Sequence, residues 1–206
     1  MPTLDYITVD QLKATLSLSG QVFADDDISA AITAASRAID NECGRHFWID
    51  DDDTTVQYYN ASSIDNVVID DLVVLSELAV DFAGDKTYSS VWTSTQFDLG
   101  PYNAANIHWP YEWIRRRWLA GWFFPAWLPK CVRVTGQFGW PEVPGTVQDA
   151  TTMLAHRLLR RKREAPFAIQ TLGMGAAGGA RGMRISQTDP DVAQMLEPYK
   201  RYRPFL

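Results

Sequence analysis

The sequence predicts a mainly α (α+β) fold: a small helical bundle with an inserted antiparallel β element and an extended C-terminal arm. Apolar residues recur at helical spacing near both ends of the chain, whereas about 47–135 alternates polar and apolar residues. A glycine-rich stretch separates the end of the chain from the rest. We therefore expect one folded domain over 1–172, followed by a tether and arm over 173–206.

Three helices are expected in the folded domain, at about 8–16, 27–43 and 144–163. Thr8 and Gln11 form a capping box at the start of the first helix. In the second, Ile28, Ala31, Ile32, Ala35, Ile39 and Cys43 share one face, and Gly44 supplies a stop signal. The third follows Pro144 and ends in a basic run.

The insertion is expected to form short strands at 55–59, 66–69, 73–80, 88–92 and 132–135, with a hairpin turn at Gly84-Asp85. The Trp-rich segment 110–129 fits neither period. Its three consecutive arginines beside tryptophans suit either nucleic-acid stacking or a loop that packs on a neighbouring subunit. We favour the second, because stacking platforms are spaced along strands. Trp118 and Trp122 are therefore candidates for subunit contacts.

Charge is divided unevenly along the 206 residues. The chain has a net charge of −6, but residues 1–110 hold 18 Asp and Glu against 4 Lys and Arg, whereas residues 111–206 hold 7 against 15. The first part is thus −14 and the second +8. Either the two parts face different partners, or they attract each other within one subunit or between neighbours.

No catalytic, metal or cofactor motif emerges. His46, His108 and His156 are far apart, there is no Cys-x-x-Cys, and the glycines of 173–182 lack the flanking strand of a dinucleotide-binding loop. The acidic run 50–53 lacks the alternating ligands and central glycine of a calcium loop, so we interpret it as a solvated loop. We expect a protein that is not an enzyme and has no cofactor or metal.

The location of the protein is also constrained by its sequence. Two cysteines make no disulfide framework and fit a reducing compartment. The first residues lack the basic and apolar regions of a signal peptide, and the most apolar run, 118–128, is too short to cross a bilayer. We expect a soluble, cytoplasmic protein with no membrane partner.

The third helix carries two features that its own fold does not require. Its main apolar stripe is expected at Val147, Ala150, Leu154 and Leu158. Met153 and Leu159 lie off that stripe, so we predict subunit–subunit contacts there. Its end holds Arg160, Arg161, Lys162 and Arg163, more charge than the helix dipole requires.

The chain ends in a tethered amphipathic segment. After the glycine-rich stretch, 183–186 is expected to form a short strand, and Asp189-Pro190 to start a short helix. Val192, Met195, Leu196 and Tyr199 form the apolar face of this helix. Such a segment is suited to reaching a partner outside its own fold.

Taken in order, four stretches resemble the tailed-bacteriophage head–tail connector (adaptor or head-completion) family. They are ITVDQLKATLSLSG with DDDISAAITAASRAIDNECGRHF, then IDDLVVLSELAVDFAGDKTYSSVW with FDLGPYNAANIHWPYEWI, then VRVTGQFGWPEVPGTVQDATTMLAHRLLRRKREAP, and finally ISQTDPDVAQMLEPYKRYR. Together they cover nearly the whole chain. The Trp-rich loop 116–124 is the part least like the family.

The resemblance implies a structural virion protein of the phage neck, located between the capsid vertex and the tail and assembled in the host cytoplasm. Family members form a ring, commonly of twelve copies, that docks on the portal protein and extends the DNA channel. The ring makes non-specific contact with packaged DNA and presents a surface to the next neck or tail protein. The alternative is another neck component, a stopper or tail-completion protein.

The resemblance also implies roles for particular residues. The C-terminal arm is the portal-docking element, with candidates Arg184, Ile185, Val192, Leu196, Tyr199, Tyr202, Phe205 and Leu206. The basic run 160–163 then faces either the portal or DNA in the lumen. We favour the portal, because this run leads directly into the tether.

Overall fold

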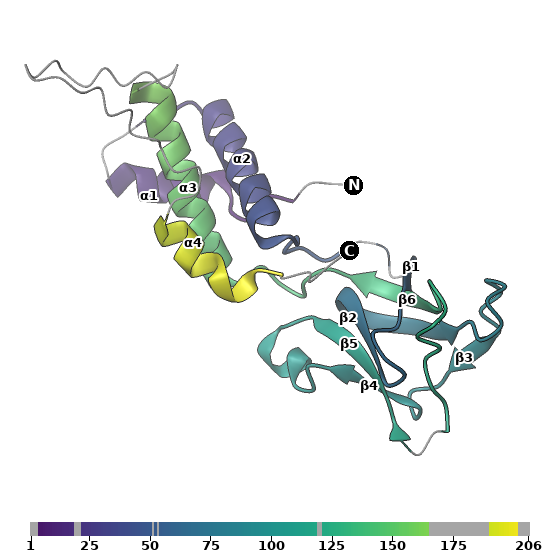
Figure 1. Cartoon of the computed structure of the whole chain (residues 1–206). Coiled ribbons are helices and arrows are strands. Elements are labelled where there is room, and N and C mark those ends of the chain that lie inside the picture. The colour runs from purple at the N-terminus through teal and green to yellow at the C-terminus, as the bar shows by residue number, and fades with distance from the viewer. Residues whose placement is uncertain are drawn as a thin grey trace, which may run out of the picture. The chain divides into compact units, whose positions relative to one another are not determined.

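The computed structural model describes residues 4–18, 22–50, 52, 54–118, 121–164 and 190–201, and the chain divides into two compact units (Figure 1). The helical unit combines Met1–His46 with Val143–Leu206, and the β unit is Phe47–Glu142. The chain thus builds the first two helices, inserts a complete β unit and returns to finish the helical unit.

The helical unit contains α1 (Val9–Leu18), α2 (Asp25–Cys43), α3 (Gly145–Glu164), α4 (Pro190–Leu196) and a 3₁₀ turn at Glu197–Tyr199. The predicted capping box is confirmed, because Thr8 N–H donates to Gln11 Oε1 at 2.7 Å and Gln11 N–H donates to Thr8 Oγ1 at 3.2 Å. The stop at Gly44 is also confirmed. Its φ of 65° is left-handed, and its N–H donates to Asp40 O at 2.8 Å.

The core of the helical unit lies where α1, α2 and α3 meet. Its fully or nearly fully buried members are Ile7, Leu12, Leu16, Ile28, Ala31, Ile32, Ala35, Ala155 and Leu159. On α3 the buried line runs through Val147, Thr151, Ala155 and Leu159, while Leu154 and Leu158 are only partly buried. The predicted stripe is therefore confirmed at Val147 and Ala150, which are both 0% exposed, and is one residue off at Leu154 and Leu158.

A buried threonine explains that error. Thr151 is fully buried, and its hydroxyl donates to Val147 O at 2.7 Å, which satisfies its polar group inside the helix. Counting only apolar residues hides this position and favours the neighbouring line. Since successive helical residues are 100° apart, lines through 154 and 158 or through 155 and 159 both fit the period.

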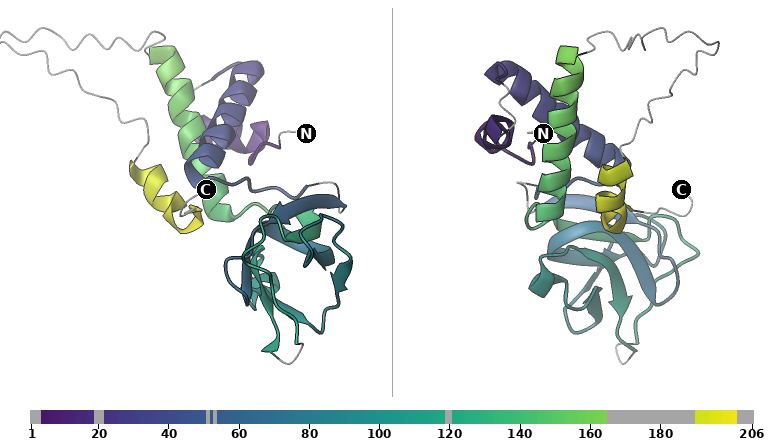
Figure 2. Two further views of the ribbon diagram at one scale, coloured as in Figure 1. Left: turned by 45° about the vertical axis from the view of Figure 1, so that its right-hand side comes forward. Right: turned by 90° about the vertical axis from the view of Figure 1, so that its left-hand side faces the viewer.

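α4 lies beside α3, as the views of Figures 1 and 2 agree. Val192 and Leu196 are 3% and 1% exposed. Arg157 of α3 pairs with Asp191 at 3.2 Å, and Arg201 N–H donates to Cys43 O at 2.8 Å. The short helix therefore completes the helical unit of its own chain.

The β unit is built on one six-stranded antiparallel sheet. Its strands are β1 (Thr55–Tyr59), β2 (Asn66–Val80), β3 (Ser90–Trp92), β4 (Phe97–Gly100), β5 (Tyr111–Arg116) and β6 (Val132–Phe138). The order is β1-β6-β2-β5-β4, and β3 pairs with the end of β2 at Leu78–Val80. The strands curve around a common core (Figure 2).

The expectation of a mainly α fold is wrong: in the described part of the chain, four helices and this sheet make the protein α+β. Two predicted strands, 66–69 and 73–80, are one continuous strand, since irregularities in its pairing let β2 bend without ending. Two further strands, β4 and β5, were not predicted. β5 was missed because only Ile114 is buried among its residues, so it shows no clear alternation.

Buried aromatic side chains also pack around Trp140 in the β unit. Trp140, 1% exposed, packs against Phe47 and Trp109 with ring centroids 5.0 and 4.7 Å away. Its indole N–H donates to the buried Asp71 carboxylate at 3.2 Å. Gly139 precedes it with a φ of 111°, and a Cβ there would lie 2.0 Å from Trp48 O. Only glycine allows this close approach of two backbones.

Candidate functional site

Four aromatic side chains form a connected, exposed group on the β unit, which we call the aromatic surface. Phe82, Trp122, Phe123 and Trp127 are 36%, 41%, 40% and 67% exposed. Phe82 lies 6.2 Å from Trp122 and 5.5 Å from Phe123, and Phe123 lies 5.8 Å from Trp127, between ring centroids. Their exposed area is on the order of 400 Å², as large as the largest apolar patches of ordinary monomers.

The aromatic surface is rooted in the core of the β unit. Trp122 contacts Trp92, which stacks on Phe124 with a centroid distance of 4.6 Å. Trp92 and Phe124 are 4% and 0% exposed, and Phe124 N–H donates to Ile64 O at 3.0 Å. The exposed rings therefore extend a packed core instead of standing on a free loop.

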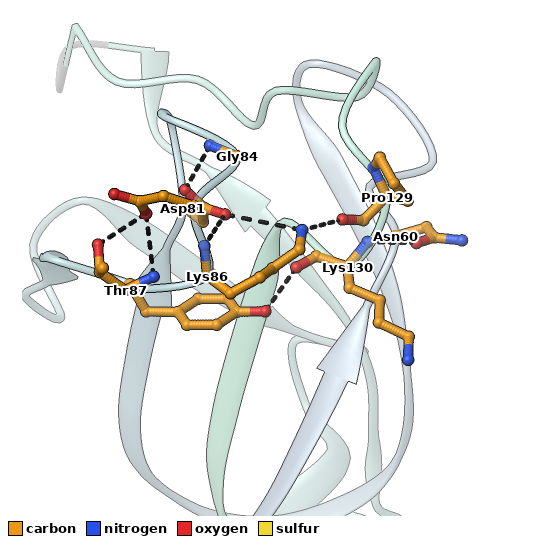
Figure 3. Close-up of polar contacts among 9 residues, drawn as sticks. Asn60, Asp81, Gly84, Lys86, Thr87, Pro129 and Lys130 are labelled. Carbon is orange, nitrogen blue, oxygen red and sulfur yellow. Dashed lines mark hydrogen bonds and ion pairs between the residues drawn. The ribbon is translucent and has the colours of Figure 1, made fainter.

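A network of polar contacts clamps together the two segments that carry these rings (Figure 3). The Asp81 carboxylate accepts hydrogen bonds from Gly84 N–H at 2.7 Å and Lys86 N–H at 3.0 Å. The Lys86 ammonium donates to Pro129 O at 2.5 Å and lies 3.7 Å from Asp81. Residues 81–88, which carry Phe82, are thus tied to the end of the segment that carries Trp127. We call this network the Asp81 clamp.

Hydrogen bonds of Tyr88 and Asn60 to the Lys130 backbone extend the Asp81 clamp. Tyr88 Oη donates to Lys130 O at 2.7 Å, and Lys130 N–H donates to Asn60 Oδ1 at 2.7 Å (Figure 3). Lys86, Tyr88 and Lys130 all have positive φ, between 51° and 64°. Side-chain-bearing residues adopt this conformation only when surrounding contacts hold them there. Three such residues in one clamp indicate that the position of the aromatic surface is strongly determined.

The ionised form of Asp81 is the one that the clamp stabilises. Burial alone raises the pKa of this carboxyl, but backbone N–H groups of Lys86, Gly84 and Ala83, together with the Lys86 charge, outweigh burial. The net result is a pKa below the ordinary value of an aspartate. Asp81 is therefore a structural anion at neutral pH.

Basic residues lie next to the aromatic surface in the sequence, but two of them are neutralised. Arg116 pairs with Asp65 and lies over the Trp118 ring, 5.1 Å from its centroid. Arg117 pairs with Asp98 at 2.6 Å. Among the described residues, the exposed side chains of Arg115 and Lys130 have no ion-pair partner. Two of the three arginines at the end of β5 are thus engaged in ion pairs within the β unit.

The same pairing resolves the uneven charge of the chain. Arg116–Asp65, Arg117–Asp98, Arg133–Glu77, Lys162–Asp27 and Lys200–Glu42 each join a cation from residues 111–206 to an acid from residues 1–110. Of the two interpretations of the charge asymmetry, attraction within one subunit accounts for these residues. Part of the asymmetry therefore reflects ion pairs within each unit whose two partners lie on either side of residue 110.

The basic run at the end of α3 is exposed. Lys162 pairs with Asp27 of α2 at 2.6 Å, so part of its charge serves the helical unit itself. Arg161 and Arg163 have no ion-pair partner within the described part of the chain. Of the four predicted basic candidates, which include Arg160, these two are the clearest candidates for a partner outside the chain.

The predicted docking and subunit residues fall into three groups. Val192, Leu196 and Leu159 are buried in the helical unit, and the contacts predicted for them with a partner stay predictions. Met153 and Tyr199 are partly buried, while Trp118 and Trp122 are 81% and 41% exposed. Arg184, Ile185, Tyr202, Phe205 and Leu206 lie outside the described residues.

Sequence reasoning missed Phe82, Phe123 and Trp127. The density of aromatic residues in 118–127 was the available signal, but Phe82 joins them only through the fold. Within the described ranges, no group of three or more His, Cys, Asp or Glu is arranged to hold a metal ion. The described helices include none with the length and hydropathy of a membrane span.

Comparison with known proteins gives structural likenesses only. No protein-family profile matches the chain, and no curated protein matches it. Among solved structures, it is similar to a chain from the neck of an empty gene transfer agent particle computed with C6 symmetry, at 18% identity and a TM-score of 0.47. It is also similar to a chain from the virion of a native gene transfer agent particle, at 14% identity and a TM-score of 0.47. Both likenesses cover 97% of this chain and 92% of the other. At these values neither likeness assigns a function.

Proposed function

We propose that this chain is a structural protein of the neck of a tailed-phage-like particle. In this proposal it forms a ring that docks on the portal, extends the DNA channel and offers an attachment surface to the next neck or tail protein. The observation that carries a contact-forming role is the aromatic surface, which is exposed and yet fixed by the Asp81 clamp. A large apolar surface held in place suits a lasting protein–protein contact.

The order of the four family-like stretches supports the neck as the site of that contact. They fall on α1 and α2, on β2 to β5, on β6 and α3, and on α4, so β1 alone among the described helices and strands lies outside them. A resemblance confined to one motif would suggest a shared local structure. A resemblance that follows the same order along nearly the whole chain supports a shared role.

The packing of α4 narrows the proposed portal contact. Val192 and Leu196 are buried within the helical unit. In this proposal the portal is therefore contacted by the other arm candidates: Arg184, Ile185, Tyr199, Tyr202, Phe205 and Leu206. Arg161 and Arg163 supply positive charge near the start of the arm. An acidic portal surface would complement them.

The test is binding of the purified full-length chain to purified portal rings from the same particle, followed by electron microscopy. Truncation after Arg201 removes the last residues but keeps α4 packed, whereas truncation after Leu172 also removes α4. We expect the full-length chain to add a ring to the portal and the Arg201 truncation to bind weakly. If the full-length chain leaves portal rings bare at all protein concentrations, the adaptor role is wrong.

Charge reversal separates the two roles of the basic run. Arg161→Glu with Arg163→Glu should weaken portal binding, while Lys13→Glu, a single reversal on the helical unit that breaks the pair with Asp25, is the control for a charge change alone. Normal docking together with loss of DNA from filled particles would instead assign these arginines to the channel lumen.

A stopper or tail-completion protein is the second candidate. The six-stranded sheet gives it more weight than the sequence did, because such neck components are usually β-rich. The long α2 and α3 favour the adaptor. Binding to an assembled adaptor ring but not to a bare portal would support the second candidate.

A further inference from the structure

We propose that the aromatic surface of one copy docks head to tail on the acidic part of the β unit of a second copy. This inference rests on the ring in the proposed function and adds the surface through which its subunits join. It concerns Phe82, Trp122, Phe123 and Trp127, and Lys130, which follows Trp127 by three residues in the sequence.

The size and composition of the aromatic surface indicate a protein occupant. Its exposed area, on the order of 400 Å², is about half of what each partner contributes to a standard interface. Tryptophan is enriched among the residues that dominate binding energy. The Asp81 clamp and the buried Trp92–Phe124 stack hold the rings in place. Little conformational entropy is therefore lost when a partner binds.

Charge complementarity selects a second copy as that occupant. Segment 111–130, which carries three of the four rings, holds four basic residues and one acidic residue. The remainder of the β unit, 47–110 with 131–142, holds twelve acidic residues and two basic residues. A basic aromatic segment thus lies within an acidic unit, and complementary potentials favour the association of one copy with the next.

The same charges argue against a symmetric pair of aromatic surfaces. Two copies of segment 111–130 facing each other would bring the unpaired Arg115 and Lys130 of one copy against those of the other, which repels. With Arg116–Asp65 and Arg117–Asp98 counted as neutral pairs, the aromatic segment carries +1 and the acidic remainder −8, so their contact is attractive. That contact is heterologous, and repeated heterologous contacts close into rings when the rotation between copies permits.

Lys130 is the residue whose charge can be tested without disturbing the Asp81 clamp. The exposed Lys130 ammonium has no ion-pair partner among the described residues, and only its backbone N–H takes part in the Asp81 clamp. Lys130→Glu therefore reverses a charge without removing a clamp contact. Its neighbour Lys86 is unsuitable for such a test, because its ammonium contacts Pro129 O and Asp81.

The experiment measures pairing in the full-length chain by mass photometry and sedimentation over a range of protein concentrations. Trp122→Ala with Trp127→Ala should weaken self-association by roughly 30-fold or more. Lys130→Glu should weaken it by a smaller factor that shrinks at high salt. The matched controls are Tyr102→Ala and Ile107→Ala, which remove side chains 64% and 63% exposed on the same unit.

Mixing the double tryptophan variant with a mass-tagged wild-type chain tests the head-to-tail geometry. The variant keeps the acidic residues of 47–110 and 131–142, so wild-type–variant pairs should form while variant–variant pairs do not. Equal loss of both kinds of pair would overturn the head-to-tail contact. Variant–variant pairs at the wild-type level would overturn the use of this surface. If the wild type forms neither pairs nor a ring on the portal, the ring itself is wrong and the inference falls with it.

Discussion

The two units of this protein treat their apolar side chains in opposite ways. Of the large hydrophobic residues that the structure describes as exposed, thirteen lie in the β unit and two, Leu4 and Val22, lie in the helical unit. The helical unit buries the apolar faces of α3 and α4 against its own helices. The β unit buries one aromatic core around Trp140 and leaves a second aromatic group open. Sequence hydrophobicity alone does not distinguish these two outcomes.

The buried aromatic core should be the most sensitive point of the β unit. Trp140→Ala removes a fully buried ring and leaves the buried Asp71 carboxylate without its indole donor. We expect a loss of about 3–5 kcal/mol in the free energy of unfolding. Urea denaturation followed by circular dichroism measures it. Trp127→Ala on the aromatic surface is the contrast, and a similar loss there would abolish the distinction between the two groups.

Leu159 tests whether α3 packs its apolar side chains into the core of its own chain. Leu159→Ala should cost about 2–5 kcal/mol, because this side chain is 1% exposed among α1, α2 and α3. Met153→Ala, on the same helix but partly buried, should cost less. Thermal unfolding of the dilute protein is the measurement. Unchanged stability for Leu159→Ala would instead support the predicted subunit contact at this residue.

Asp81 tests whether the aromatic surface is held or merely exposed. Asp81→Asn removes the anion that accepts from Gly84 and Lys86, so the midpoint of unfolding should fall, but by less than for Leu159→Ala. Since the pKa of Asp81 is lowered in the fold, its contribution is fully present above about pH 4 and is lost as the pH falls through the folded-state pKa. The variant should lose less stability than the wild type over that acidic range. Parallel losses would mean that the clamp does not depend on charge.

The ion pairs of the helical unit should have the smallest effect. Lys162→Ala breaks the pair with Asp27, whose side chains are 63% and 41% exposed. Exposed pairs contribute at most about 1 kcal/mol, and salt screens them. A thermal shift measured at low and high salt checks this. A large, salt-insensitive loss would show that Lys162 has a packing role in addition to its charge.

Local chemistry accounts for what the sequence predicted well. The start of α1 follows from Thr8 and Gln11, and the end of α2 follows from Gly44, because a cap depends on residues within one turn. Strand β1 was predicted with its observed limits from alternation alone. These signals do not require knowledge of where the rest of the chain lies.

Only the tertiary structure decided the points on which function depends. Leu158 and Leu159 fit the helical period almost equally, and packing against α1 and α2 buries the second. β5 lacks alternation, and Arg116 is partly neutralised by Asp65, about fifty residues earlier in the chain. Phe82 joins Trp122 and Phe123 because a hairpin turn and the Asp81 clamp bring them together. Burial, ion pairing and clustering depend on contacts between distant residues, so the sequence alone determined the elements and the tertiary structure determined which surfaces remain open.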